Sequence, residues 1–306
     1  MRALAAGIAL MLAPLQALAF DYQLTAREIA PDTYVVPGRM EHFNRANGGN
    51  IVNTGFVVTS AGVVVIDSGP SLDYGRQLRQ LIGTVTDRPV RLVLITHAHP
   101  DHYLGNSAFG DVAISALDGT RAEIAGTPPA LLDGIYRLVG DAMAGTTLIP
   151  PTGVVAKGPL VVGDHDLELL ALDGHTRADL AVFDRTTGTL FAGDIAFLDR
   201  TPTTPQADID HWLAALDRLR ALPAKLVVPG HGPVAPPPQA FDQTAAYLTW
   251  LRQALFAAAA RGLDAPEVID MKLPEEFAGL AVARAEFART VAHLYPTFER
   301  SVLSDK

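Results

Sequence analysis

The chain of 306 residues contains no cysteine. Disulfide bonds, thiolate nucleophiles and cysteine-bound metals are therefore excluded, so any metal site must be built from histidine, aspartate and glutamate. Charged residues make up 19% of the chain and aromatic residues 7%, whereas 49% of the residues are hydrophobic. This composition is typical of a globular protein with a sizeable core.

Positive charge is also scarce. The chain has 24 lysine and arginine residues against 33 aspartate and glutamate residues, which gives a formal net charge of −9 at pH 7. No run of like charges forms a tail, and an acidic surface disfavours polyanionic partners. We therefore expect a small-molecule substrate and no nucleic-acid partner. Nothing in the sequence indicates an oligomeric state.

The N-terminal segment has the pattern of an export signal. Met1-Arg2 is a short basic start, and the apolar run from Ala3 to Ala13 is too short to span a bilayer as a helix. Ala17-Leu18-Ala19 then gives the small-x-small pattern of a signal-peptidase site. We predict that residues 1–19 are a cleaved signal peptide. The mature chain would begin at Phe20, contain no integral membrane segment and be exported to the periplasm.

Runs rich in Val, Ile and Phe alternate with amphipathic segments, which indicates an α/β fold. Strands are predicted at residues 34–36, 55–59, 62–67, 91–96, 167–172, 180–183, 189–192 and 225–228. Helices are predicted at residues 71–82, at 118–143 with an interruption at Pro128-Pro129, at 210–222, and throughout the region after residue 238.

The order of these segments repeats weakly. In the first half, a predicted strand ends at Asp67 and is followed by a helix and a strand that leads to His97. In the second half, the strand predicted at residues 189–192 leads to Asp194 and is followed by a helix and a strand that leads to His231. We therefore expect two related sheets that face each other, with these polar residues at one shared edge, where loops carry functional sites.

A dense polar cluster follows the strand predicted at residues 91–96. Residues 96–102 read Thr-His-Ala-His-Pro-Asp-His. In a core this cluster would be unfavourable, because each polar group needs its own partner. A tight turn after a buried strand can instead direct the side chains toward one point, and imidazole nitrogen and carboxylate oxygen are ordinary zinc ligands. The cluster predicts four metal ligands: His97, His99, Asp101 and His102.

Three further polar residues follow predicted strands and stand beside glycine: His175, Asp194 and His231. Glycine allows the backbone to turn sharply and to approach a metal closely. Together with the cluster, these residues supply five histidines and two aspartates, which suffice for two metal ions.

The segments HAHPDH, GHT, FAGD and PGHG, in this order, resemble the motifs of the metallo-β-lactamase superfamily over roughly residues 30–235. The resemblance implies an α/β fold, the four-layer αββα metallo-β-lactamase sandwich, with the metals at the edge of its two sheets. The expected division is a signal peptide at 1–19, a metallo-β-lactamase-fold domain at 20–239 and a helical C-terminal extension at 240–306.

The resemblance also implies two Zn²⁺ ions per chain and a ligand set for each. The first zinc would be held by His97, His99 and His175, and the second by Asp101, His102 and His231. Asp194 would bridge the two ions together with a hydroxide.

Two aspartates have further roles in this scheme. Asp67, in VVVIDSG, matches the family's aspartate that supports the site by hydrogen bonding. Asp101 is the expected catalytic residue, a proton shuttle, because it is a ligand with a second oxygen free to accept a proton.

The expected function is a dizinc hydrolase that uses the bridging hydroxide to cleave an ester, thioester or related carbonyl bond in the periplasm. Asp194 resembles the bridging aspartate of glyoxalase II-like hydrolases. Export, the segment at residues 42–58 and the helical tail resemble more narrowly the zinc metallohydrolases of periplasmic quinoprotein relay systems.

Other functions remain open. The HxHxDH pattern is shared with some metallo-β-lactamases, so a periplasmic enzyme that hydrolyses β-lactam antibiotics is one alternative. A mononuclear-iron redox enzyme of the same fold is another, and it would leave His102 or part of the second site unused. A non-catalytic binding module is disfavoured, because all seven expected ligand positions are present.

Two regions outside the motifs are also of interest. Segment Arg39–Asn50 is predicted to be a loop above the metals or a plain surface loop, and the helices after residue 240 are predicted to pack on the sandwich, with a lid or dimer surface as alternatives. Four arginines are candidates to reach the pocket: Arg39, Arg45, Arg177 and Arg200. Three histidines are not expected to bind metal: His165, His211 and His293.

Overall fold

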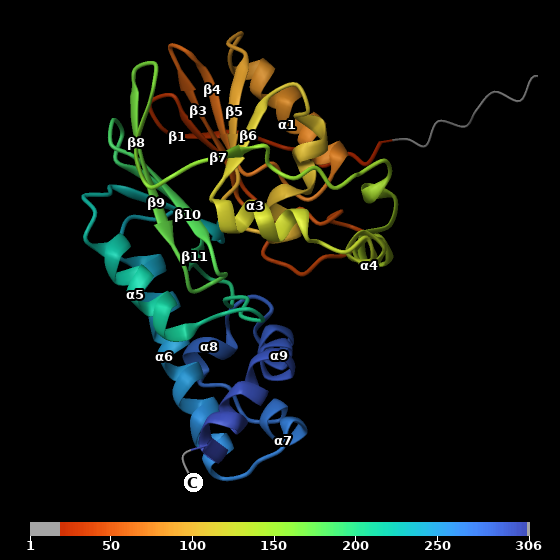
Figure 1. Cartoon of the computed structure of the whole chain (residues 1–306), viewed down its shortest axis with the longest axis vertical. Helices are drawn as coiled ribbons and strands as arrows, with labels where there is room; N and C mark the ends of the chain where they lie inside the picture. The colour runs from red at the N-terminus through yellow and green to blue at the C-terminus, as the bar shows by residue number, and fades with distance from the viewer. Residues whose placement is uncertain (1–18, 305–306) are drawn as a thin grey trace, which may run out of the picture.

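A computed structural model describes residues 19–304 of the chain. The predicted signal peptide, residues 1–19, therefore lies outside the described residues except for Ala19. Two β-sheets face each other and carry helices on their outer surfaces (Figure 1). The expected four-layer αββα sandwich with a helical C-terminal region is confirmed.

The first sheet has seven strands in sequence order. They are β1 (Arg27–Ala30), β2 (Thr33–Val36), β3 (Thr54–Thr59), β4 (Gly62–Ile66), β5 (Val90–Leu94), β6 (Ala113–Ala116) and β7 (Gly153–Val154). Every residue of β3 and β4 is buried, as expected for strands covered on both faces. The strands from β4 to β7 are parallel, so helices connect several of them across the outer face.

Helices of the first half cover this sheet and one of its edges. They are α1 (Leu72–Val85), α2 (Pro100–Tyr103), α3 (Asp118–Ala125) and α4 (Ala130–Val139), with short 3₁₀ turns η1 (Leu104–Ala108) and η2 (Gly140–Met143). Helix α1 begins after Ser71, whose side chain accepts a hydrogen bond from the Tyr74 amide and so caps the helix. The helical interruption predicted at Pro128-Pro129 separates α3 from α4.

The second sheet has five strands in the order β12-β11-β10-β9-β8. They are β8 (Gly158–Val162), β9 (His165–Leu172), β10 (Asp179–Asp184), β11 (Thr189–Phe197) and β12 (Leu226–His231). Helix α5 (Ile209–Arg220) joins the parallel pair β11 and β12, as α1 joins the parallel pair β4 and β5. The repeat expected from the sequence is therefore present in the two sheets.

One predicted strand end is wrong. We expected a strand to end at Ala192, just before Asp194, but β11 continues to Phe197. Gly193 adopts a φ of 53°, and the pairing of β11 with β12 shifts register on both sides of it. Such an irregularity redirects side chains within a strand, so Asp194 reaches the site from inside β11 rather than from a loop.

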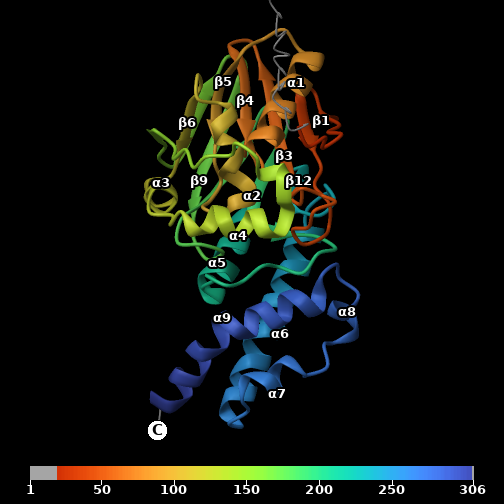
Figure 2. The same ribbon diagram turned by 90° about the vertical axis from the view of Figure 1, so that its right-hand side faces the viewer.

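The C-terminal helices extend beyond the sandwich. They are α6 (Gln239–Ala260), α7 (Ala265–Ile269), α8 (Glu275–Ala278) and α9 (Ala283–Ser304). Helix α6 contacts α5 and β11, and α9 crosses α6 below the edge of the sandwich that carries α4 (Figure 2). The expected packing on the sandwich is observed, whereas the domain boundary at residue 240 stays a prediction. Within residues 19–304, no helix has both the length and the apolar character needed to span a membrane.

Candidate metal centre

The seven predicted ligands lie together at one edge of the two sheets, although they come from four separate segments of the chain. Their ligand atoms form two groups, each with its atoms within 4.8 Å of one another. The first group contains His97, His99, His175 and Asp194, and the second contains Asp101, His102 and His231. All of these side chains except His99 are buried.

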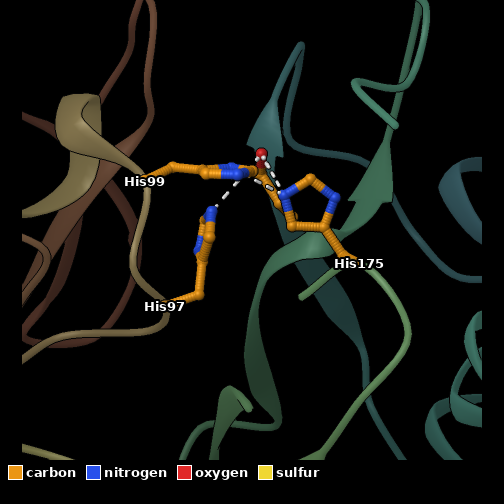
Figure 3. A group of neighbouring side chains, drawn as sticks. His97, His99 and His175 are labelled. Carbon is orange, nitrogen blue, oxygen red and sulfur yellow. Dashed lines mark hydrogen bonds and ion pairs between the residues drawn. The ribbon is translucent and has the colours of Figure 1, made fainter. Parts of the chain in front are cut away.

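In the first group, three imidazole rings approach a common centre (Figure 3). Nε2 of His175 lies 3.0 Å from Nδ1 of His99 and 3.3 Å from Oδ2 of Asp194. Nε2 of His97 lies 3.8 Å from the same carboxylate oxygen. This is the donor set expected for the first zinc, with Asp194 beside it.

In the second group, Asp101 lies between two imidazoles. Its Oδ2 is 3.4 Å from Nε2 of His231 and 3.6 Å from Nε2 of His102. Asp194 reaches this group as well, because its two oxygens lie 3.3 Å from Nε2 of His102 and 3.3 Å from Nε2 of His231. Asp194 thus occupies the position between the two groups that a bridging ligand requires.

Hydrogen bonds on the outer side of the rings fix their orientation. Nδ1 of His231 lies 2.7 Å from the carbonyl oxygen of Ile51 and donates to it. Nε2 of His99 lies 3.0 Å from Oε1 of Gln206. Such contacts hold the opposite nitrogen of each ring toward the centre and set the tautomer that can bind metal.

Asp67 supports the centre from the end of β4, as the sequence predicted. Its φ of 60° is unusual for a residue other than glycine. Oδ1 accepts a hydrogen bond from the Thr96 amide at 2.8 Å, and Oδ2 lies 2.8 Å from Nδ1 of His102. Asp67 therefore orients both an imidazole and the turn that carries the histidine cluster.

Close backbone approach explains two of the glycines. A Cβ on Gly230 would lie 1.9 Å from Oδ1 of Asp194. Gly174 has a φ of 129°, and a Cβ there would lie 2.3 Å from the backbone of Trp212. A side chain at either position would displace a metal-binding segment, so glycine is required.

Several atoms of the centre have no hydrogen-bond partner although they are buried: Nε2 of His97, Nε2 of His102 and Oδ1 of Asp194. Buried polar atoms without partners are rare in native proteins. Imidazole nitrogen and carboxylate oxygen are also the atoms that coordinate zinc. The residues present therefore fit metal ions at both groups.

Electrostatic effects in the metal-free centre are large. Burial, together with neighbouring imidazoles, lowers the pKa of His97 well below its usual range and lowers the pKa of His99 to about 3. Burial also opposes charge on His102, but three nearby carboxylates outweigh it and raise its pKa. For Asp194, burial is outweighed by the surrounding imidazoles, so its pKa is lowered.

A cavity of about 810 Å³ opens over the centre. Four of the predicted ligands form part of its lining: His99, Asp101, Asp194 and His231. Of the four candidate arginines, Arg200 lines this cavity, whereas Arg177 lines a different one beside α5. His42 and Phe43 also line it, so the segment Arg39–Asn50 does lie beside the centre.

Three charged residues of the cavity were not predicted from the sequence: Arg137 of α4, and Glu286 and Arg289 of α9. No local pattern distinguishes them from surface charges, because only the tertiary packing brings their helices to the site. Among the other histidines, His165 pairs with Asp184 at 2.9 Å and His211 pairs with Asp173 at 2.5 Å. Neither belongs to a metal-binding group.

Comparison with known proteins gives a consistent picture. The family model described as "Metallo-beta-lactamase superfamily" matches residues 47–231. A linear primary-alkylsulfatase of a Pseudomonas species is 24% identical over 277 residues, which cover 76% of this chain and 52% of the alkylsulfatase. This chain thus spans about half the length of that relative. An acyl-coenzyme A thioesterase of Bos taurus is 27% identical over 206 residues, which cover 60% of this chain and 74% of the thioesterase.

Solved structures support the fold. A metallo-beta-lactamase from Pontibacter korlensis matches with a TM-score of 0.60 and 23% identity, covering 74% of this chain and 99% of the lactamase. At this identity the likeness concerns the fold alone.

Proposed function

The chain belongs to the metallo-β-lactamase superfamily, and we propose that it is a dizinc hydrolase that cleaves an ester, thioester or related carbonyl bond of a small molecule. The observation that carries this proposal is the position of Asp194, whose oxygens lie 3.3 Å from imidazoles of both groups. The hydrolytic names of the relatives, an alkylsulfatase and a thioesterase, support the same reaction class.

In the proposed centre, seven residues hold the two ions. His97, His99 and His175 would hold the first ion and Asp101, His102 and His231 the second, and Asp194 would contribute to both. Zinc ions bound in this way supply an activated water as nucleophile and polarise the substrate carbonyl.

The remaining chemistry falls to the protein. Asp101 lines the cavity, so its carboxylate lies within reach of a bound substrate. We assign it the transfer of a proton from the attacking water to the leaving group. Phe197 stacks on His231 with ring centroids 5.2 Å apart, and Trp212 meets His175 edge-on at 4.8 Å. These contacts limit the motion of the ligand rings.

We also propose export to the periplasm and a place among the quinoprotein relay metallohydrolases. The signal-peptide pattern supports export. In addition, the backbone nitrogen of Phe20 lies 3.0 Å from Oδ2 of Asp73. Cleavage after Ala19 would therefore leave the new α-ammonium group beside a carboxylate.

The direct test is hydrolysis of an ester and a thioester by protein that has been stripped with a chelator and then reconstituted. We expect both activities to disappear on chelation and to return with zinc. Activity that survives complete removal of metal would exclude the proposal. Restoration by iron alone, at one ion per chain, would favour the mononuclear redox alternative.

A further inference from the structure

Helix α4 presents an apolar face to the cavity above the centre. Leu131, Gly134, Ile135 and Leu138 line the cavity and recur at the spacing of one helical face. Leu138 is 52% exposed, which is high for a large apolar side chain. Phe43 adds a ring from the neighbouring loop. This face, residues 131–138, is called the α4 wall below.

Gly134 opens a gap in the middle of the α4 wall. Glycine inside a helix is less favourable than alanine, because its backbone loses more conformational freedom on folding. At Gly134 the backbone has no positive φ, and an added Cβ would meet no atom within 4 Å. Neither backbone strain nor steric crowding therefore requires glycine at position 134. The space that a side chain would occupy there is part of the open cavity. Between Leu131 and Leu138 the wall runs for about 10 Å at the helical rise per residue.

Another part of the cavity lining, formed by the loop after β11 and by α9, carries charge. Arg200 is 1% exposed and Glu286 is fully buried, with 3.7 Å between NH2 of Arg200 and Oε1 of Glu286. Arg289, on the next turn of α9, lies 3.7 Å from the same oxygen. The hydrogen bonds that Arg200 donates are long, 3.3 Å to Thr203 and 3.4 Å to the Glu41 carbonyl. Its Nε has no partner, so this buried guanidinium retains unused capacity to donate.

The charges do not cancel. Apart from the candidate metal ligands, the charged residues that line the cavity are three arginines and one carboxylate, which give a net formal charge of 3 − 1 = +2: Arg137, Arg200, Arg289 and Glu286. The chain as a whole has a formal charge of −9. A cationic cavity in an acidic protein favours an anionic ligand.

The C-terminal region holds this charged side in place. Ala281 accepts a hydrogen bond from the Thr201 amide at 3.1 Å, and its own amide donates to Asp199 at 2.9 Å. These backbone bonds on either side of Arg200 tie the loop after β11 to the start of α9. Helix α9 therefore completes the cavity, although it lies outside the segment that matches the family model.

We propose that the substrate is an anionic amphiphile, an ester or thioester with an extended apolar chain. The chain lies along the α4 wall over Gly134, the scissile carbonyl lies at Asp101 and Asp194, and the anionic group lies at Arg289 and Arg200. This proposal rests on the hydrolytic function proposed above and specifies its substrate class.

The first experiment measures kcat/KM for a series of acyl thioesters of increasing chain length. Burial of each methylene against the α4 wall increases kcat/KM up to about fourfold. In Gly134→Leu, a side chain fills the gap, so the ratio of long-chain to short-chain kcat/KM falls by about tenfold, through KM. The melting temperature does not fall, because leucine favours the helix.

Gly83→Leu is the matched control. Gly83 lies in α1, also with no atom within 4 Å of an added Cβ, and it does not line the cavity. We expect the ratio of long-chain to short-chain kcat/KM of this variant to match that of the unmodified protein. The proposal is overturned if Gly134→Leu lowers kcat/KM equally for short-chain and long-chain substrates, or if it does not lower kcat/KM at all.

The second experiment tests the charge. In Arg289→Gln, the ratio of kcat/KM for an anionic ester to that for a neutral ester of equal chain length falls at least several-fold. Arg284→Gln, on the same helix and of similar exposure, is the control with no change in this ratio. An unchanged ratio in Arg289→Gln would overturn the assignment of the substrate's anionic group to Arg289 and Arg200.

Failure of the proposed function can be distinguished from failure of this inference. Binding of a fluorescent long-chain alkyl carboxylate, measured on the full chain with and without chelator, reports on the cavity without any turnover. Binding that Gly134→Leu weakens and Gly83→Leu does not supports the α4 wall even if no ester is hydrolysed. Absence of binding together with hydrolysis of short esters alone contradicts the inference and leaves the hydrolase intact.

Discussion

Oδ2 of Asp67 lies 2.8 Å from Nδ1 of His102, and the opposite nitrogen of that ring lies 3.3 Å from Asp194. Asp67 thereby holds a predicted ligand of the second metal without contacting the metal itself. Since such supporting carboxylates set both the orientation and the basicity of an imidazole, the Asp67→Asn variant should bind its second zinc about 10–100-fold more weakly.

A competition titration with a chromogenic chelator measures this change. Asp184→Asn is the matched control, because Asp184 is equally buried and pairs with His165 at the far end of its strand. Both variants are expected to lose stability, but only Asp67→Asn should lose metal. Equal zinc affinity in the two variants would show that Asp67 has a purely structural role.

Replacement of Asp194 by alanine should lower the occupancy of both metals. Its carboxylate approaches imidazoles of both groups, so its loss would remove a ligand from each ion. Elemental analysis of the purified variant gives the answer. Two tightly held zinc ions per chain in Asp194→Ala would disprove the bridging role.

Processing of the N-terminus can be followed by mass spectrometry of the native protein. We expect a mature chain that begins at Phe20 in the periplasmic fraction. In that form, Asp73→Asn should lower the free energy of unfolding by up to about 1 kcal/mol, because the α-ammonium group loses its carboxylate. A soluble cytoplasmic protein that retains Met1 would refute the export proposal.

Hydrolysis of β-lactam antibiotics should be weak. Lactamases dock the carboxylate of the drug beside the second zinc, where Asp194 here adds negative charge. A chromogenic cephalosporin and a thioester, assayed side by side, should show far higher kcat/KM for the thioester. A cephalosporin value near 10⁶ M⁻¹s⁻¹, high in the usual enzyme range, would instead identify a dedicated lactamase.

The grouping of the candidate ligands could be predicted because its information is local. The histidine and aspartate residues follow apolar runs in the sequence, and Gly230 and Gly174 are needed where the backbone approaches a candidate ligand or a neighbouring helix. The parallel units around α1 and α5 follow from apolar runs and helical periodicity. These patterns were sufficient to predict two facing sheets with a shared polar edge.

Other features depend on contacts between distant segments. The end of β11 was predicted wrongly because the bulge at Gly193 depends on pairing with β12. Glu286 and Arg289 belong to an amphipathic helix, and the sequence alone predicts that its charged side chains face solvent. In the structure Glu286 instead lies against Arg200 and Arg289. From the sequence, Gly134 indicates only a residue that lowers the stability of its helix. The open space beside it is evident only from the three-dimensional structure.

Zinc stoichiometry tests the central claim most directly. Metal-free protein is titrated with zinc while hydrolysis of a thioester and bound metal are measured in the same samples. We predict that activity reaches its maximum at two zinc ions per chain and is lost again on chelation. Full activity at one ion per chain, or activity restored by iron and not by zinc, would contradict a dizinc hydrolase.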